Sequence, residues 1–280
     1  MLHNIEKIIR TRKSVRTYEN RVIESEKEKL IFDFMKNNSI GIFGNKVEFY
    51  WIDANSDEYK NVKLGTYGVI LGTKYFITGK IKNSEKNFED FGYCMEKLVL
   101  FCTELNLGTC WLGGTYRKTA FSNSIDLKDN EIIPAVISVG YFGDKKSMID
   151  KVFRFTVEAD KRKPFDDLFF SQTFSQKLSE YEKEKYGFCL EMMQLAPSAS
   201  NKQPWRIILK DNVFHFFLKR TPNYNKTILH SDLQRVDMGI AISHFELSLI
   251  EKNITHNWII GNLNMELENL TEYVAGCEIK

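Results

Sequence analysis

The 280-residue sequence predicts an α+β fold built from two related halves, residues 1–160 and 161–280. In both halves, segments with helical spacing of apolar residues alternate with short segments rich in β-branched and aromatic residues. Each half also contains a long amphipathic helix that is followed by a tryptophan, Trp111 in the first and Trp258 in the second. This internal similarity indicates two units of the same kind in one chain.

The expected elements of the first half follow from these two patterns. Apolar residues at helical spacing predict helices over residues 3–11, 24–37 and 89–107. β-branched and aromatic residues predict strands over residues 47–53, 67–78 and 132–139. Gly108 is expected to end the long helix in a left-handed turn, which glycine adopts without steric strain.

The second half is expected to repeat the mixture of helices and strands. A helix over residues 188–195 is ended by Pro197, and a loop follows to Trp205. Further on, we expect strands over residues 206–209 and 214–218, a long helix over 232–251 and a last strand over 258–260.

Composition narrows the class of protein. The 39 basic and 37 acidic residues leave a formal charge of +2, so neither a nucleic-acid partner nor a membrane partner is expected. The first residues contain no apolar stretch typical of a signal peptide, and no apolar run approaches the length of about 18 residues that a membrane helix needs. We therefore expect a cytoplasmic protein. The five cysteines lack a CxxC pair and are expected to be buried free thiols, with no metal site.

Three segments are candidates for ligand binding. In the first, Arg12, Ser14 and Arg16 alternate with Lys13 and Val15, so an extended backbone would place all three side chains on one side. Two guanidinium groups and a hydroxyl group suit a phosphate monoester. A solvated basic loop is the alternative explanation.

The second candidate is the segment from Pro197 to Trp205, whose sequence is PSASNKQPW. Two prolines restrict its backbone, while Ser198, Ser200 and Asn201 can direct hydrogen bonds into a cleft. A simple connection between a helix and a strand is the alternative.

The third candidate is the glycine pair that follows Trp111. Gly113 and Gly114 would let a flat ligand approach the backbone N–H groups closely, and a plain turn is the alternative. No dinucleotide-binding GxGxxG, phosphate-binding lysine loop or GxSxG nucleophile motif is present. The five histidines form no catalytic pattern, and His244 is expected to be a buried histidine with its hydrogen bonds satisfied. We therefore assign no catalytic side chain.

Together these segments resemble the FMN-dependent nitroreductase family. Members carry an early R-[RK]-S-x-R motif, a P-S-x-x-N-x-Q-P-W loop, a central helix ending in G-x-x-x-W-x-G, a strand ending in V-G-Y and a later R-[RK]-P. The matching residues here are Arg12 to Arg16, Pro197 to Trp205, Gly108 to Gly114, Val139 to Tyr141, and Arg162 to Pro164. The resemblance implies a nitroreductase-like fold and one FMN per site.

The order of the motifs departs from the family pattern. In the family, the P-S-x-x-N loop comes soon after the arginine motif, and two identical subunits share each flavin. Here the loop lies in the second half, which is explained by a tandem duplication that yields a single-chain pseudo-dimer. Residues 38–45 would be the decayed counterpart of the loop, and residues 171–175 the decayed counterpart of the arginine motif. One flavin site and a monomeric protein are therefore expected.

The resemblance also assigns roles to residues. Arg12, Ser14 and Arg16, with Lys13 between them, would hold the phosphate and the pyrimidine edge of the flavin. Arg162, with Lys161, would add positive charge. The backbone of Gly113 and Gly114 would face flavin N5. The ring and ribityl chain would be lined by Pro197, Ser198, Ala199 and Asn201.

The function implied is an NAD(P)H-dependent oxidoreductase that reduces nitroaromatics, quinones or similar flat electrophiles by ping-pong hydride transfer. The cofactor would supply the redox chemistry. The alternative is a protein that binds FMN for storage or sensing without turnover.

Overall fold

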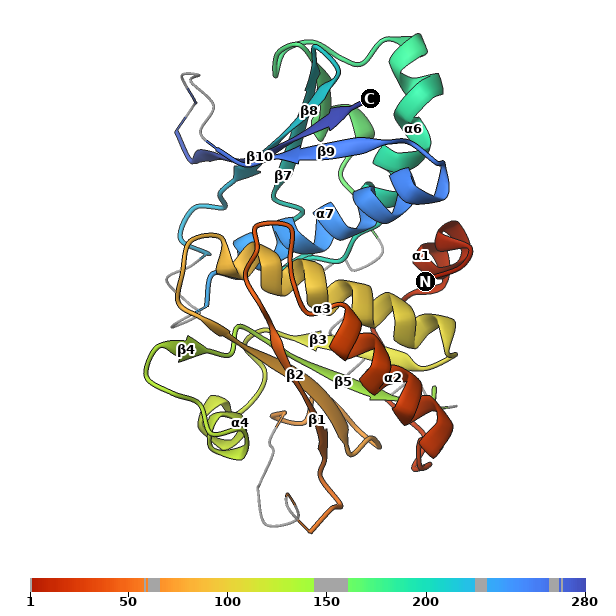
Figure 1. The fold of residues 1–280 in the computed structure, drawn as a ribbon, viewed down its shortest axis with the longest axis vertical. Helices are drawn as coiled ribbons and strands as arrows, with labels where there is room; N and C mark the ends of the chain where they lie inside the picture. The colour runs from red at the N-terminus through yellow and green to blue at the C-terminus, as the bar shows by residue number, and fades with distance from the viewer. Residues whose placement is uncertain are drawn as a thin grey trace.

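Two long helices cross between two β-sheets in the computed structural model (Figure 1). They are α3 (Asn87–Glu104) and α7 (Leu233–Glu251). The structure describes residues 2–57, 59, 66–143, 161–224, 231–261, 267 and 269–280. The mixture of helices and antiparallel sheets confirms the α+β class. Within these residue ranges, no helix has the length and apolar character needed to cross a bilayer.

The first sheet is formed by the first half of the chain. Its elements are α1 (Ile5–Thr11), α2 (Ser25–Asn37), β1 (Glu48–Asp53), β2 (Tyr75–Lys82), α3, β3 (Gly108–Leu112), α4 (Lys118–Ser124), β4 (Glu131–Ile132) and β5 (Val136–Gly140). The strands follow the order β1-β2-β5-β3, and β4 pairs with β2. All of these pairs are antiparallel.

The second sheet is formed by the second half. Its elements are η1 (Phe165–Asp167), β6 (Phe169–Ser171), α6 (Glu180–Gln194), η2 (Ala199–Asn201), β7 (Trp205–Lys210), β8 (Val213–Lys219), α7, β9 (His256–Ile259) and β10 (Thr271–Ile279). The order is β6-β7-β8-β10-β9, with β6 parallel to β7 and the other pairs antiparallel.

The two sheets share a topology. The order β1-β2-β5-β3 in one corresponds to β7-β8-β10-β9 in the other. In each case a helix, α2 or α6, precedes the first strand, and the long helix connects the second strand to the third. This repeat agrees with the internal similarity of the sequence, while the origin of the two halves by duplication remains a prediction.

Two glycines allow the backbones of α3 and α7 to touch. A Cβ atom on Gly92 would lie 2.1 Å from the carbonyl oxygen of Val236, and one on Gly239 would lie 1.8 Å from the carbonyl oxygen of Glu89. Any side chain at either position would therefore push the helices apart. The contact brings the N-terminal parts of both helices against the opposite half.

Buried polar side chains also join the two helices. Glu96 of α3 accepts hydrogen bonds from Trp111 Nε1, at 2.7 Å, and pairs with His244 Nε2 of α7, at 2.9 Å. The other ring nitrogen of His244 lies 3.0 Å from the carbonyl oxygen of Met192. His244 is fully buried, so the expectation of a satisfied core histidine is confirmed. The five cysteines are buried and free, as expected.

Some predicted boundaries in the first half were wrong. The strand predicted over residues 67–78 begins only at Tyr75, because Tyr67, Gly68 and Gly72 have positive φ angles that interrupt an extended backbone. Gly108 does not end α3 in a left-handed turn. Asn106 has that conformation, and Gly108 begins β3.

The strand predicted over residues 132–139 is split into β4 and β5 around Pro134, which cannot donate a backbone hydrogen bond to a sheet.

In the second half, two elements extend beyond their predicted limits. Helix α6 begins at Glu180 rather than residue 188, because Ser179 and Glu182 form a capping box at its start. The strand predicted over residues 258–260 is β9, and it is not the last, since β10 follows and lies between β8 and β9.

Candidate functional site

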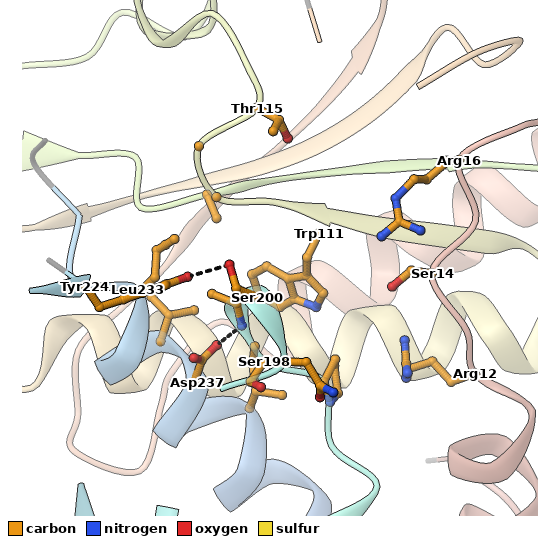
Figure 2. Close-up of a pocket in the computed structure, with 18 of the residues that line it drawn as sticks. Arg12, Ser14, Arg16, Trp111, Thr115, Ser198, Ser200, Tyr224, Leu233 and Asp237 are labelled. Carbon is orange, nitrogen blue, oxygen red and sulfur yellow. Dashed lines mark hydrogen bonds between the residues drawn. The ribbon is translucent and has the colours of Figure 1, made fainter. Parts of the chain in front are cut away.

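A cavity of about 330 Å³ lies between the two halves, and it brings together most of the residues singled out from the sequence. The predicted site residues that line it are Arg12, Ser14, Arg16, Gly113, Gly114, Arg162, Pro197, Ser198, Ala199 and Asn201. Figure 2 shows the Arg12, Ser14 and Arg16 side chains on one side and Ser198, Ser200 and Asp237 on the other. The volume of the cavity is at the lower end of the range typical of small-molecule sites.

The arginine segment is held in an extended conformation beside β3. The backbone N–H of Val15 donates to the carbonyl oxygen of Thr109 at 2.8 Å, and Ser14 forms an isolated parallel bridge with Thr109. Val15 points into the core, where it packs against the face of Gly108 that carries no side chain. Because the segment is extended, Arg12, Ser14 and Arg16 lie on one side of it, as their alternation in the sequence predicted, and all three line the cavity.

The guanidinium groups give the cavity a positive wall. Arg12 Nε is buried and has no hydrogen-bond partner among the described residues. Burial lowers the pKa of the Arg12 guanidinium, and the nearby Glu96 carboxylate opposes this effect. Arg16 is only 7% exposed. Because the buried Arg12 Nε atom has a hydrogen-bond donor that the described residues leave unused, this wall is suited to bind an anion.

The loop from Pro197 to Asn201 forms the opposite wall. Ser200 and Asn201 have φ angles of 48° and 53°, in the left-handed region. The Asn201 side chain donates to the carbonyl oxygen of Lys161 at 2.8 Å, and Arg162 Nη1 donates to Asn201 Oδ1 at 3.3 Å. Ser198 Oγ accepts from the backbone N–H of Gln203 at 2.9 Å. These bonds fix the loop and place Arg162 in the cavity.

Two of the predicted residues are not among the lining residues. The Lys13 Nζ atom lies 5.2 Å from the centroid of the Phe142 ring. Lys161 is exposed and contributes its carbonyl oxygen to the loop. Alternation explains the position of Lys13, since it occupies the opposite side of the extended segment from Ser14.

The glycine pair leaves the end of β3 open. A Cβ atom on Gly114 would meet no atom within 4 Å, whereas one on Gly113 would lie 2.5 Å from Leu233 Cδ1. A ligand in the cavity can therefore approach the backbone of this turn directly.

Sequence reasoning missed the contribution of α7 to the cavity. Leu233, Val236, Asp237 and Ile240 form one face of this helix and line the cavity. Their spacing is that of an apolar helix face, and the signal that could have identified them is the carboxyl group of Asp237 on that face. Tyr224 is also in the lining, and its hydroxyl group donates to Ser200 Oγ at 3.2 Å.

Asp237 is 2% exposed, and its side chain accepts one hydrogen bond from the described residues. Its Oδ1 atom accepts from the backbone N–H of Ala199 at 2.9 Å (Figure 2), while Oδ2 has no partner among the described residues. Burial raises the pKa of the Asp237 carboxyl group well above its ordinary value, and the Asp232 carboxylate adds to the shift.

Comparison with known proteins identifies the family. A family model described as "Putative TM nitroreductase" matches residues 4–249. The chain belongs to this nitroreductase family. Membership supports a general oxidoreductase role for the protein. No curated protein matches the chain.

Solved structures show that this nitroreductase-family protein has a nitroreductase-like fold, as the sequence resemblance implied. A crystal structure described as a putative nitroreductase from Thermotoga maritima has a TM-score of 0.58 and 21% identity, and the match covers 98% of this chain and 93% of that one. A structure described as an oxidoreductase containing FMN has a TM-score of 0.50 and 14% identity, covering 63% and 96%. A nitroreductase family protein from Clostridium novyi NT has a TM-score of 0.43 and 19% identity, covering 53% and 91%.

Proposed function

We propose that this protein binds one FMN in the cavity and uses it to transfer electrons from NAD(P)H to a flat electrophile such as a nitroaromatic or a quinone. The observation that carries the proposal is the buried Nε atom of Arg12, which has no hydrogen-bond partner among the described residues; Arg12 lines the same cavity as Ser14 and Arg16. A phosphate group would supply the missing acceptor and the compensating charge. A protein of similar fold is described as an oxidoreductase containing FMN.

The walls of the cavity suit the remaining parts of FMN. Arg12, Ser14 and Arg16 would hold the phosphate and the pyrimidine edge, and Arg162 would add positive charge, with Lys13 and Lys161 just outside the cavity. The open backbone at Gly113 and Gly114 would lie against the ring near N5. Pro197, Ser198, Ala199 and Asn201 would cover the ring and the ribityl chain from the other half.

When bound, FMN supplies hydride acceptance and donation, and the chain supplies binding and orientation. The positive wall would stabilise negative charge on the reduced ring. The apolar face of α7 would exclude water from the electrophile. No side chain in this proposal needs to act as an acid or base for the first half-reaction, in which NAD(P)H is the electron donor.

We also propose that the chain is a single-chain pseudo-dimer with one site. The repeated topology supports it, and so do Gly92 and Gly239, which precede Trp111 and Trp258 by the same spacing. At the place of the decayed loop, Asp90 accepts hydrogen bonds from the backbone N–H groups of Phe43 and Asn45. The Asp90 side chain thereby fills the space beside Gly41. A loop that binds a ligand would need this space to be empty.

Titration with FMN is expected to saturate at one flavin per chain, because in the described part of the chain one set of motifs lines a cavity with arginine side chains. The measurement is the quenching of flavin fluorescence against a known protein concentration. A ratio of two would contradict the single-site proposal.

The purified protein is expected to be yellow, and its flavin absorbance should fall when NADH or NADPH is added without oxygen. A subsequent quinone or nitroaromatic should restore the absorbance. A flavin that neither nicotinamide reduces would favour the alternative of FMN storage or sensing. A protein that stays colourless after FMN addition would contradict both functions.

We further propose that the protein works as a monomer in the cytoplasm. Both walls of the cavity come from one chain, and the five free, buried cysteines suit a reducing compartment. Sedimentation of the FMN-loaded protein as a dimer would contradict the proposal that it works as a monomer.

A further inference from the structure

The α7 wall of the cavity combines an apolar surface with one carboxyl group. Leu233, Val236 and Ile240 present apolar side chains, and Asp237 lies between them on the same face of the helix. None of these residues is needed for the FMN contacts proposed above. In small-molecule sites, a single polar group within an apolar wall fixes the orientation of the ligand.

Asp90 of α3 and Asp237 of α7 occupy corresponding positions, but they differ in how many of their carboxyl oxygens are hydrogen-bonded. Asp90 and Asp237 each lie two residues before the glycine at the helix crossing, and each accepts a backbone N–H from the loop packed against its helix. Asp90 uses both oxygens, since Oδ1 accepts from Phe43 and Oδ2 accepts from Asn45. Among the described residues, Asp237 is hydrogen-bonded only through Oδ1, and its buried Oδ2 has no partner in a residue that lines the cavity.

The surroundings of Asp237 favour its neutral form. No cation among the described residues forms an ion pair with it. Among the described residues, the hydroxyl group of Tyr224 and the carboxylate of Asp232 interact with it, and Arg12, Arg16 and Arg162 line the same cavity. Asp232 pairs with Arg220 at 2.6 Å. Burial and the negative charge of Asp232 both raise the pKa of Asp237. A protonated carboxyl group has one O–H donor.

We propose that Asp237 donates a hydrogen bond from its carboxyl group to an acceptor oxygen of the electrophile that lies against α7. The ligand class is a flat, apolar molecule with a carbonyl or nitro oxygen at its edge. The hydrogen bond orients that oxygen and stabilises the negative charge that develops on it during reduction. The inference rests on the proposed function, because it places the electrophile in the cavity that FMN shares.

Two ligands and two variants test this role in the FMN-loaded protein. Calorimetric titration compares 1,4-naphthoquinone with naphthalene, which has the same rings but no acceptor oxygen. Asp237→Leu is expected to weaken naphthoquinone binding by about tenfold, the usual effect of losing one such hydrogen bond. Naphthalene binding should be unchanged or tighter. Asp237→Asn retains an N–H donor and should bind naphthoquinone within about threefold of the unmodified protein.

The pH dependence separates a protonated donor from a charged acceptor. Naphthoquinone binding to the unmodified protein should weaken as pH rises through the raised pKa of Asp237, and binding to Asp237→Asn should not. An equal loss of binding in Asp237→Asn and Asp237→Leu would overturn the proposal. So would an Asp237→Leu variant that weakens FMN binding as much as naphthoquinone binding, because the carboxyl group would then face the cofactor.

A measurement on the flavin-free protein distinguishes failure of this inference from failure of the proposed function. The infrared difference spectrum between the unmodified protein and Asp237→Asn should contain the C=O band of a protonated carboxylic acid at neutral pH. Its absence would overturn the donor role even if FMN binds. Its presence in a protein that does not bind FMN would contradict the proposed function alone. Asp90→Asn is the matched control and should leave naphthoquinone affinity unchanged.

Stability gives a second readout on the same protein. Because the pKa of Asp237 is higher in the folded than in the unfolded state, the folded state keeps a proton that the unfolded state loses. The contribution of Asp237 to stability is therefore present below its ordinary pKa and is lost as pH rises through the raised pKa. The Tm of Asp237→Asn should rise relative to the unmodified protein over that pH range. A difference in Tm that is independent of pH would contradict the raised pKa.

Discussion

Replacing Arg12 with alanine is expected to weaken FMN binding by about 10- to 100-fold. A charge-assisted hydrogen bond to a buried phosphate contributes about 1.5–3 kcal/mol, and each 1.4 kcal/mol changes a dissociation constant tenfold. Arg16→Ala should have a similar effect. The stability of the flavin-free protein should change little in Arg12→Ala, because the loss of the attraction to Glu96 is offset by removal of a buried charge whose Nε atom has no hydrogen-bond partner among the described residues.

The matched control is Arg10→Ala. Arg10 lies close by on α1, but its ion pairs with Glu6 and Glu191 are on the surface, so FMN affinity should be unchanged. Riboflavin, which lacks the phosphate, is the second control. If Arg12→Ala and Arg16→Ala both bind FMN as tightly as the unmodified protein, the phosphate lies elsewhere and the proposed orientation of the cofactor is wrong.

The second large effect is expected at the crossing of the long helices. Gly239→Ala should lower the free energy of unfolding by about 3 kcal/mol or more, the upper end of the range for overpacked interiors. The new Cβ atom would lie 1.8 Å from the carbonyl oxygen of Glu89, and a backbone atom in a helix cannot move aside as a side chain can. Gly92→Ala should act in the same way against Val236. Urea unfolding followed by circular dichroism measures both.

Gly187→Ala is the control for this pair. Gly187 is inside α6, and a Cβ atom there would meet nothing within 4 Å. The same substitution should stabilise the protein by roughly 0.5–1 kcal/mol, since alanine favours the helix more than glycine does. A Gly239→Ala variant as stable as Gly187→Ala would show that the helices do not cross as closely as described.

Short-range patterns in the sequence predicted the fold class and most of the cavity. Alternation in Arg12, Ser14 and Arg16 was sufficient because the segment is extended against β3. The apolar spacing of α3 and α7 located both long helices. The segment from Pro197 was recognised from residues that restrict the backbone and donate hydrogen bonds.

The remaining features depend on contacts between distant segments. The role of Gly108 is set by its contact with Val15, which lies far away in sequence. The local sequence alone therefore could not show whether Gly108 ends a helix or begins a strand. The strand β6 is too short for its spacing to be recognised, and its pairing with β7 depends on tertiary structure. Asp237 was overlooked although its carboxyl group on an apolar helix face was visible in the sequence, because only the folded structure shows that one of its oxygens has no partner among the described residues.

The cavity has a further consequence, because its two principal walls are parts of one polypeptide. Two separate subunits must meet before a shared site exists, so the fraction of complete sites falls on dilution. Linking both walls in one chain replaces that encounter with an intramolecular one at a fixed effective concentration. The site should therefore remain assembled at the lowest protein concentrations, and its affinity for a ligand should not vary with the amount of protein present.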